Sequence, residues 1–199
     1  MKFDQYLSGM VELRVPPERT EELLQQILAL GADKVGAVPV AEIDFEPSFR
    51  SLCESNACGM YGRSWMCPPH VGKVEDLIAQ AKGYQTALVY QIVDTLEDSY
   101  DFEGMMAAGE RMNRLTAAVR RKFEELGLEN CLFLGAGGCR ICSKCAKQDD
   151  EPCRYPDLAM SSLEAYGVNV SVLAPQAGMK YINGVNTVTY FGAVLLGER

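Results

Sequence analysis

Apolar residues along the chain repeat alternately at helical and at strand spacing. After Pro16 and Pro17 a stripe of leucine and isoleucine follows the helical period and ends at Gly31, which predicts a helix. The same period predicts a short helix over 73–82, a long one over 101–126 and another over 157–166. Each of these three is followed directly by a glycine, the residue that most often ends a helix. The chain is therefore expected to contain four helices.

Runs of β-branched and other apolar residues predict five strands between these helices. They cover Val35–Ile43, Ala87–Val93, Cys131–Leu134, Val168–Ala174 and Thr187–Leu196. Pro39 cannot donate a ladder hydrogen bond, so the first strand is expected at a sheet edge. Strands that alternate with helices predict an α/β (α+β) fold, with a mixed sheet of about five strands flanked by helices. Two cysteine-rich loops, at about 47–72 and 135–156, are expected at one end of that sheet.

Length and charge narrow the class of protein. A chain of 199 residues suits a single cysteine-rich domain over 1–199. The formal net charge of −8 argues against nucleic-acid binding, which usually needs a basic face. The N-terminus lacks the apolar core of a signal peptide, and no apolar run reaches the roughly 18 residues that a membrane span needs. These features predict a cytoplasmic protein that binds neither nucleic acid nor membrane.

Eight cysteines are many for a reducing compartment, where structural disulfides are rare. A domain of this size also buries enough surface to fold without cross-links. The cysteines are therefore expected to bind metal or to carry redox chemistry.

Four cysteines form a compact group in the carboxy-terminal half. Cys139, Cys142 and Cys145 follow one another at two-residue gaps, and Cys153 comes after seven further residues. This is ferredoxin-like spacing, in which successive thiolates reach different corners of an iron–sulfur cube. Cations lie within or beside the group, as an anionic cluster requires: Arg140, Lys144, Lys147 and Arg154. The spacing predicts a [4Fe–4S] cluster on these four thiols.

Zinc and unliganded thiols are the alternatives for this group. Structural zinc sites usually take two separated CxxC pairs, whereas here the third cysteine continues directly in the same register. The glycines before Cys139 lack the spacing and the Lys-Ser/Thr ending of a phosphate-binding loop.

Cys53, Cys58 and Cys67 form a second group, closed by Pro68 and Pro69. Basic residues outnumber acidic ones here, which suits a second anionic cluster or an anionic ligand. Three thiols leave a fourth position open. Cys131, His70 or an exogenous ligand are the candidates, and a site that takes no cluster is the alternative. Cys131 starts an apolar strand, where cysteine often packs as a small hydrophobe, and a lone histidine beside two prolines is more often a surface turn residue.

Both groups together resemble a known family. The matching residues run through Cys53-x4-Cys58-Gly59-Met60-Tyr61-Gly62-x4-Cys67-Pro68-Pro69, then Gly137-Gly138-Cys139-x2-Cys142-x2-Cys145-x7-Cys153-Arg154-x-Pro156, then Ser161–Gly167. This pattern resembles the prokaryotic predicted metal-binding proteins of domain of unknown function family 2284, over roughly residues 10–195. The resemblance implies metal binding, with the seven cysteines of the pattern as ligands, and implies no particular activity. Cys131 lies outside that pattern.

Electron transfer to a redox partner protein is the function that the ferredoxin-like spacing favours. An enzyme or an activating accessory protein is the alternative, with an open iron and a small-molecule ligand at Cys53, Cys58 and Cys67. A zinc-stabilised binding module is a third. The chain holds a single histidine, His70, and no Ser-His-Asp arrangement, so the sequence leaves open whether the protein is an enzyme.

Overall fold

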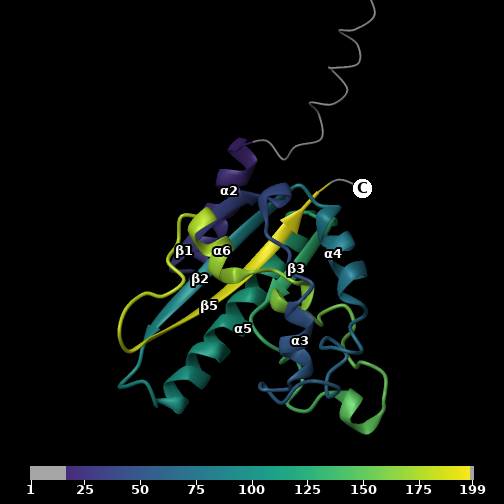
Figure 1. The fold of residues 1–199 in the computed structure, drawn as a ribbon. Helices are drawn as coiled ribbons and strands as arrows, with labels where there is room; N and C mark the ends of the chain where they lie inside the picture. Colours follow the sequence, from purple (N-terminus) through teal and green to yellow (C-terminus); the bar gives the residue numbers. More distant parts are fainter. Residues whose placement is uncertain (1–16, 198–199) are drawn as a thin grey trace, which may run out of the picture.

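The computed structural model describes residues 17–197, and five strands in it form one mixed sheet (Figure 1). The strands are β1 (Lys34–Pro39), β2 (Thr86–Thr95), β3 (Cys131–Gly135), β4 (Ser161–Ser162) and β5 (Thr187–Leu196). Their order in the sheet is β1-β2-β5-β3-β4. The β3–β4 pair is parallel and the other pairs are antiparallel. This confirms the predicted mixed sheet of about five strands, and it confirms the edge position of the strand that contains Pro39.

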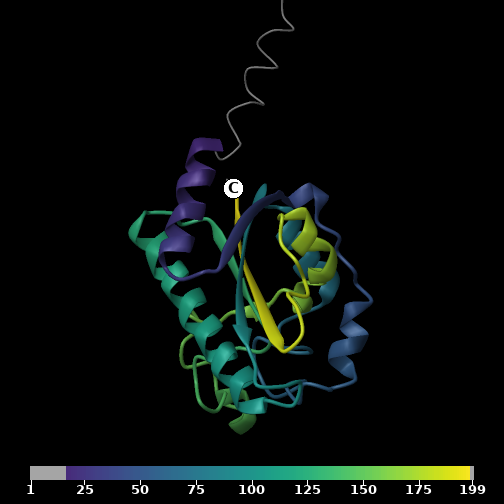
Figure 2. The same cartoon turned by 90° about the vertical axis from the view of Figure 1, so that its left-hand side faces the viewer.

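Helices cover both faces of the sheet (Figure 2). On one face lie α2 (Pro17–Ala29) and α5 (Phe102–Glu125), and on the other lie α4 (Val74–Lys82) and α6 (Val170–Gln176). A further short helix, α3 (Phe49–Glu54), lies near the cysteines. Three 3-10 turns complete the elements: η1 (Val40–Glu42), η2 (Ala146–Asp149) and η3 (Glu164–Tyr166).

Alternate residues of the central strands belong to two separate cores, because neighbouring side chains of a strand point to opposite faces. On β2, Leu88 and Tyr90 pack among α2 and α5, whereas Ala87 and Val89 pack among α4 and α6. The ten residues of β2 pair with β5 along their whole length. These two paired strands form the centre of the sheet.

Two predicted elements are wrong. Residues 168–174, predicted as a strand, belong mostly to α6, and residues 157–166, predicted as a helix, contain β4 and η3. Two smaller differences concern 35–43, where the strand ends at Pro39 and η1 follows, and 47–72, which contains α3.

Both cysteine loops lie at the same end of the sheet, the lower end in Figure 1. Residues 136–160 connect β3 to β4, and a parallel pair needs such a long crossover. In place of the usual helix, this crossover carries the carboxy-terminal cysteines. Residues 55–73 connect α3 to α4 beside it.

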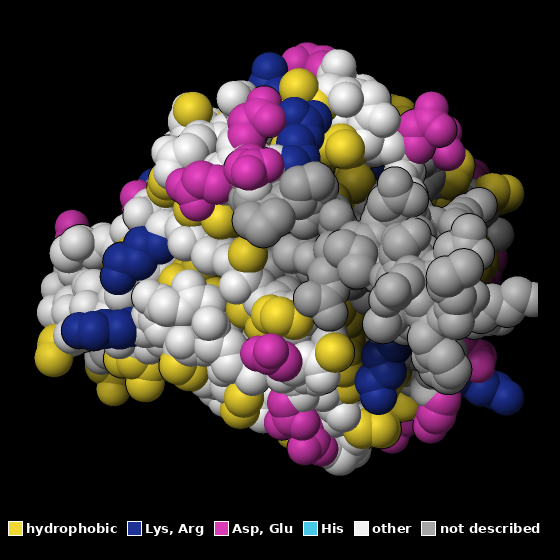
Figure 3. All heavy atoms as spheres, turned by 90° about the horizontal axis from the view of Figure 1, so that it is seen from above, with side chains coloured by type: hydrophobic (Ala, Val, Ile, Leu, Met, Phe, Trp, Pro, Cys, Tyr) yellow, Lys and Arg dark blue, Asp and Glu magenta, His cyan; other side chains and the backbone are white. Residues whose placement is uncertain are grey.

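The opposite end of the molecule, seen in Figure 3, shows acidic and basic side chains interspersed among its described residues. Within residues 17–197, no helix is long and apolar enough to cross a membrane.

Candidate metal centre

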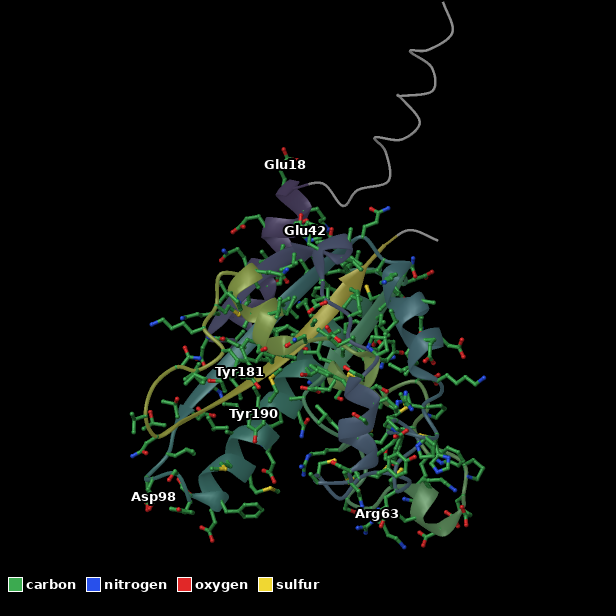
Figure 4. All side chains as sticks on the ribbon, viewed as in Figure 1. Glu18, Glu42, Arg63, Asp98, Tyr181 and Tyr190 are labelled. Atoms are coloured by element: carbon green, nitrogen blue, oxygen red, sulfur yellow. The ribbon has the colours of Figure 1, made fainter. Side chains whose placement is uncertain are left out.

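The two cysteine loops pack against each other through hydrogen bonds that involve residues 63–66. Arg63 Nη2 donates to Gln148 Oε1 at 2.8 Å, and Trp65 Nε1 donates to the Glu151 carbonyl at 2.8 Å. Arg63 lies at the lower end of the molecule in Figure 4, among these loops. Ser161 Oγ, at the start of β4, donates to the Met66 carbonyl at 3.0 Å. The amino-terminal loop is thereby fixed against the crossover.

All four carboxy-terminal cysteines line one small cavity. Cys139, Cys142, Cys145 and Cys153 share it with side chains that include Ser64, Trp65 and Arg154. Its volume is about 20 Å³, close to the room that one water needs. The donor set fits a four-thiolate cluster, and the loop has to widen to receive a cube.

Cys145 lies in the most anion-stabilising surroundings of the group. Burial alone would raise the pKa of its thiol. Hydrogen bonds from the N–H groups of Lys147 and Trp65 and from the Ser64 hydroxyl, with the nearby Arg154 guanidinium, outweigh burial and lower this pKa. Because the thiolate is the metal-binding form, these donors prepare Cys145 to act as a ligand.

The amino-terminal cysteines line a second cavity of about 280 Å³. Cys53, Cys58 and Cys67 share it with Gly138 and Glu164. Burial raises the pKa of the Cys67 thiol, which a hydrogen bond from Ser64 partly offsets. Burial also raises the pKa of the Cys53 thiol, and Arg50 opposes that rise. Cations or a metal in this cavity would stabilise both thiolates.

Ser64 and Gly138 lie between the two cysteine groups. Ser64 is fully buried, and its hydroxyl is within hydrogen-bonding reach of Cys67 in one group and Cys145 in the other. A Cβ on Gly138 would lie 3.4 Å from Cys67 Sγ and 3.3 Å from Met60 Cγ. A side chain at this position would therefore crowd Met60 and Cys67, and glycine lets the Cys139 loop lie against them without that crowding.

The sequence that forms these two cavities matches a known protein family. Residues 36–196 match the family described as "Predicted metal-binding protein (DUF2284)". The chain belongs to this family. The matched residues include both cysteine groups, so membership in a metal-binding family agrees with the two thiol-lined cavities. Searches of curated proteins and of solved structures found no match.

Cys131 and His70, the two candidate fourth ligands of the family's amino-terminal group, lie outside both cavities. Cys131 packs against the α2–α5 core, and burial raises the pKa of its thiol to about 11. It starts β3, so it lies about 13 Å along the strand from Gly135, where the cysteine loop begins. The exposed His70 ring lies edge-on to Trp65, with 5.3 Å between the ring centroids. The structure therefore gives neither residue a place beside Cys53, Cys58 and Cys67.

Glu164 is the acidic residue in the cavity of Cys53, Cys58 and Cys67. The family pattern contains it within Ser161–Gly167, but no role at the site was inferred for it from the sequence. It belongs to η3, in a segment predicted as an ordinary helix. Ser64 was missed as well, because nothing but its place between cysteines distinguishes it from other serines.

Within residues 17–197, no three side chains of His, Cys, Asp or Glu lie close enough together to hold a single metal ion.

Proposed function

We propose that this member of the metal-binding family is a cytoplasmic iron–sulfur protein that serves in electron transfer or as a redox accessory protein. Its [4Fe–4S] cluster is held by Cys139, Cys142, Cys145 and Cys153. The observation that carries the proposal is that these four thiols, already set at ferredoxin-like spacing, line one cavity. When bound, the cluster supplies reversible one-electron chemistry.

The surroundings of the four thiols suit an anionic cluster. Arg154 lines the cavity, and its Nη1 also donates to the Lys144 carbonyl at 3.1 Å, which fixes the loop between the ligands. Lys147 stacks over Trp65, with its Nζ 5.0 Å from the ring centroid, and pairs with Asp150. The indole and the adjoining loop restrict water at the cavity, and burial together with hydrogen bonding to sulfur tunes the potential of such clusters.

A second candidate function rests on the cavity of Cys53, Cys58 and Cys67. Three thiols and one carboxylate line a space of about 280 Å³ that can admit a ligand of a few atoms. A second cluster held there would have one iron without a protein thiolate. This arrangement supports an enzyme or an activating accessory protein that binds a small molecule at that iron.

Electron exchange would take place at the loop end of the molecule. The cysteines of the carboxy-terminal group are partly exposed, and Tyr155 and Leu158 beside Cys153 are exposed apolar side chains. Tunnelling needs a short path, so a redox partner protein is expected to dock there.

The experiment is an EPR-monitored redox titration of protein purified without oxygen, with two alanine variants. The proposal predicts a reversible one-electron signal of a reduced [4Fe–4S] cluster in the wild type and in Cys131→Ala. Cys142→Ala is expected to lose that signal. A signal as strong in Cys142→Ala as in the wild type, or one that is lost in Cys131→Ala while the protein stays folded, would overturn the ligand assignment.

A further inference from the structure

Three cavities adjoin one another between α5 and the loop that carries Cys139. Their volumes are about 510, 250 and 270 Å³. Asn113 of α5 and Arg140 of the loop line all three, so the cavities form a continuous groove. The groove begins at Cys58, Cys139 and Cys142 and ends at β5.

The middle cavity is positively charged. Arg114 and Arg140 line it with Asn113 and the backbone of Gly135–Gly138, and no acidic residue is among its lining. Within residues 17–197, the Arg140 guanidinium has no hydrogen-bond or ion-pair partner. Arg114 pairs only with Glu110, at 3.7 Å, and these side chains are 71% and 67% exposed. An ion pair as exposed as this one contributes little to stability. Both guanidinium groups are therefore available to bind an anion.

The outer cavity is aromatic. Tyr181 and Phe191 stack with 6.0 Å between ring centroids and 16° between ring planes, and Tyr190 lines the cavity next to them. Figure 4 shows Tyr181 and Tyr190 near each other at β5, where α5 passes. Tyr190 Oη donates to the Met105 carbonyl at 3.2 Å, which fixes its ring against the helix. A planar ring can lie against the half-exposed face of Tyr181.

A simpler role for Arg140 is to neutralise the negative charge of the proposed cluster. Arg154, and not Arg140, lines the cavity that all four carboxy-terminal thiols share. Arg140 lines the groove along its whole length instead. Its charge can therefore serve a ligand in the middle and outer cavities as well as Cys139, Cys142 and Cys145, with which it lines the remaining cavity.

We propose that the groove binds a small planar aromatic anion. Its carboxylate or phosphate lies between Arg114 and Arg140, and its ring lies in the outer cavity against Tyr181. Glu164, which also lines the outer cavity, can accept hydrogen bonds from N–H or O–H groups on the ring. Cysteines line one end of the groove, but the residues assigned to the ligand (Arg114, Arg140, Tyr181 and Glu164) are not cysteines, so the site goes beyond the proposed function and does not depend on it.

Isothermal titration with two matched probes tests this site. The anion 2-naphthoate and its neutral counterpart 2-naphthamide have the same ring, and the 270 Å³ cavity admits it. We expect saturable binding of naphthoate at least tenfold tighter than that of naphthamide, because charge-assisted hydrogen bonds are the stronger ones. Competition by inorganic phosphate would indicate a natural phosphate ligand, and its absence a carboxylate.

Three variants locate the binding. Arg140→Gln is expected to weaken naphthoate by tenfold or more and to leave naphthamide unchanged, and Tyr181→Ala to weaken both. Arg121→Gln, an exposed arginine of α5 outside the groove, is the control. Failure of naphthoate to saturate, or equal losses in Arg121→Gln and Arg140→Gln, would overturn the proposal. The metal content of each variant is measured separately, so a loss of the cluster is distinguished from a loss of the ligand site.

Discussion

At the scale of single residues, the donors around Cys145 do the most to prepare the site. Backbone N–H groups of two different loops and the Ser64 hydroxyl are directed to one sulfur. Hydrogen bonds to a thiolate favour the charged form and lower its pKa. Cys131, which has burial and no such donors, shows the opposite shift, to a pKa of about 11. In the metal-free protein the two thiols should therefore differ strongly in reactivity.

Ser64→Ala tests this difference. Removing the hydroxyl takes a hydrogen bond from the Cys145 thiolate, so the pKa of this thiol rises. The measurement is the pH dependence of iodoacetamide alkylation at Cys145 in reduced, metal-free protein, followed by mass spectrometry. The midpoint is expected to move to higher pH.

Ser55→Ala is the control for that experiment. The Ser55 hydroxyl donates to the Leu52 carbonyl and not to Cys67 or Cys145, the two thiols that Ser64 contacts. The Cys145 midpoint of this variant should match the wild type. An unchanged midpoint in Ser64→Ala, or an equal shift in both variants, would refute the role assigned to Ser64.

At the scale of elements, the site is made by the docking of one loop on another. The crossover 136–160 and the loop 55–73 meet at Gly138, whose lack of a side chain lets the crossover lie against Cys67 and Met60. A valine there would place its Cβ 3.4 Å from the Cys67 sulfur and 3.3 Å from Met60 Cγ, and it would add two further methyl groups. Close packing leaves no room to accommodate it without moving a loop.

Gly138→Val should therefore separate the loops and lower the iron content per chain, whereas Gly135→Val should not. Gly135 is a suitable control because a Cβ at that position would meet no atom within 4 Å. Iron is measured on both variants after oxygen-free purification, with circular dichroism to show that each has folded. Equal iron in the two variants would show that the close approach at Gly138 is unimportant for metal binding.

Apolar spacing predicted most elements correctly, and α6 shows where it misleads. Val168, Val170 and Val172 alternate like a strand, but Val170, Leu173, Ala174 and Ala177 also follow helical spacing. Within α6 the buried residues are Val170, Leu173 and Ala174, whereas Val172 is exposed. The 157–166 segment failed for another reason. Its Ser161 and Ser162 pair with β3, a tertiary contact that local propensity does not contain. Helix α3 has no buried residue, so no apolar pattern in the sequence predicted it.

At the scale of the whole molecule, the two hydrophobic cores lie along the sheet and the seven cysteines of the two groups lie beyond its end, whereas Cys131 belongs to β3. Residues 87–92 of β2 and 191–196 of β5 are buried, and neither strand contains a cysteine. A domain of this size buries enough surface to be stable without a cross-link or a metal. The sheet is thus expected to persist when the loops lose their metal.

Removal of the metal tests whether the sheet is stable independently of the cysteine loops. After treatment with a chelator and an oxidant, far-UV circular dichroism should change little, and limited proteolysis should cut within 55–73 and 136–160. Loops that depend on a metal open easily, whereas sheet cores open only with global unfolding. Loss of the sheet signal together with the metal would contradict the account.

Cysteine spacing alone predicted the two groups, and the fold brings each group to a single cavity. The contacts between the groups could not be predicted, because Ser64 and Gly138 acquire their roles only when loops distant in sequence dock. The groove beyond Cys139 depends in the same way on α5, β5 and the crossover lying together.

The most direct test of the central claim is the content of iron, zinc and acid-labile sulfide per chain in protein purified without oxygen. A cluster on Cys139, Cys142, Cys145 and Cys153 predicts about four irons and four sulfides, and a second cluster at Cys53, Cys58 and Cys67 predicts about eight of each. Zinc without sulfide would contradict the account and make the cysteines a structural zinc site.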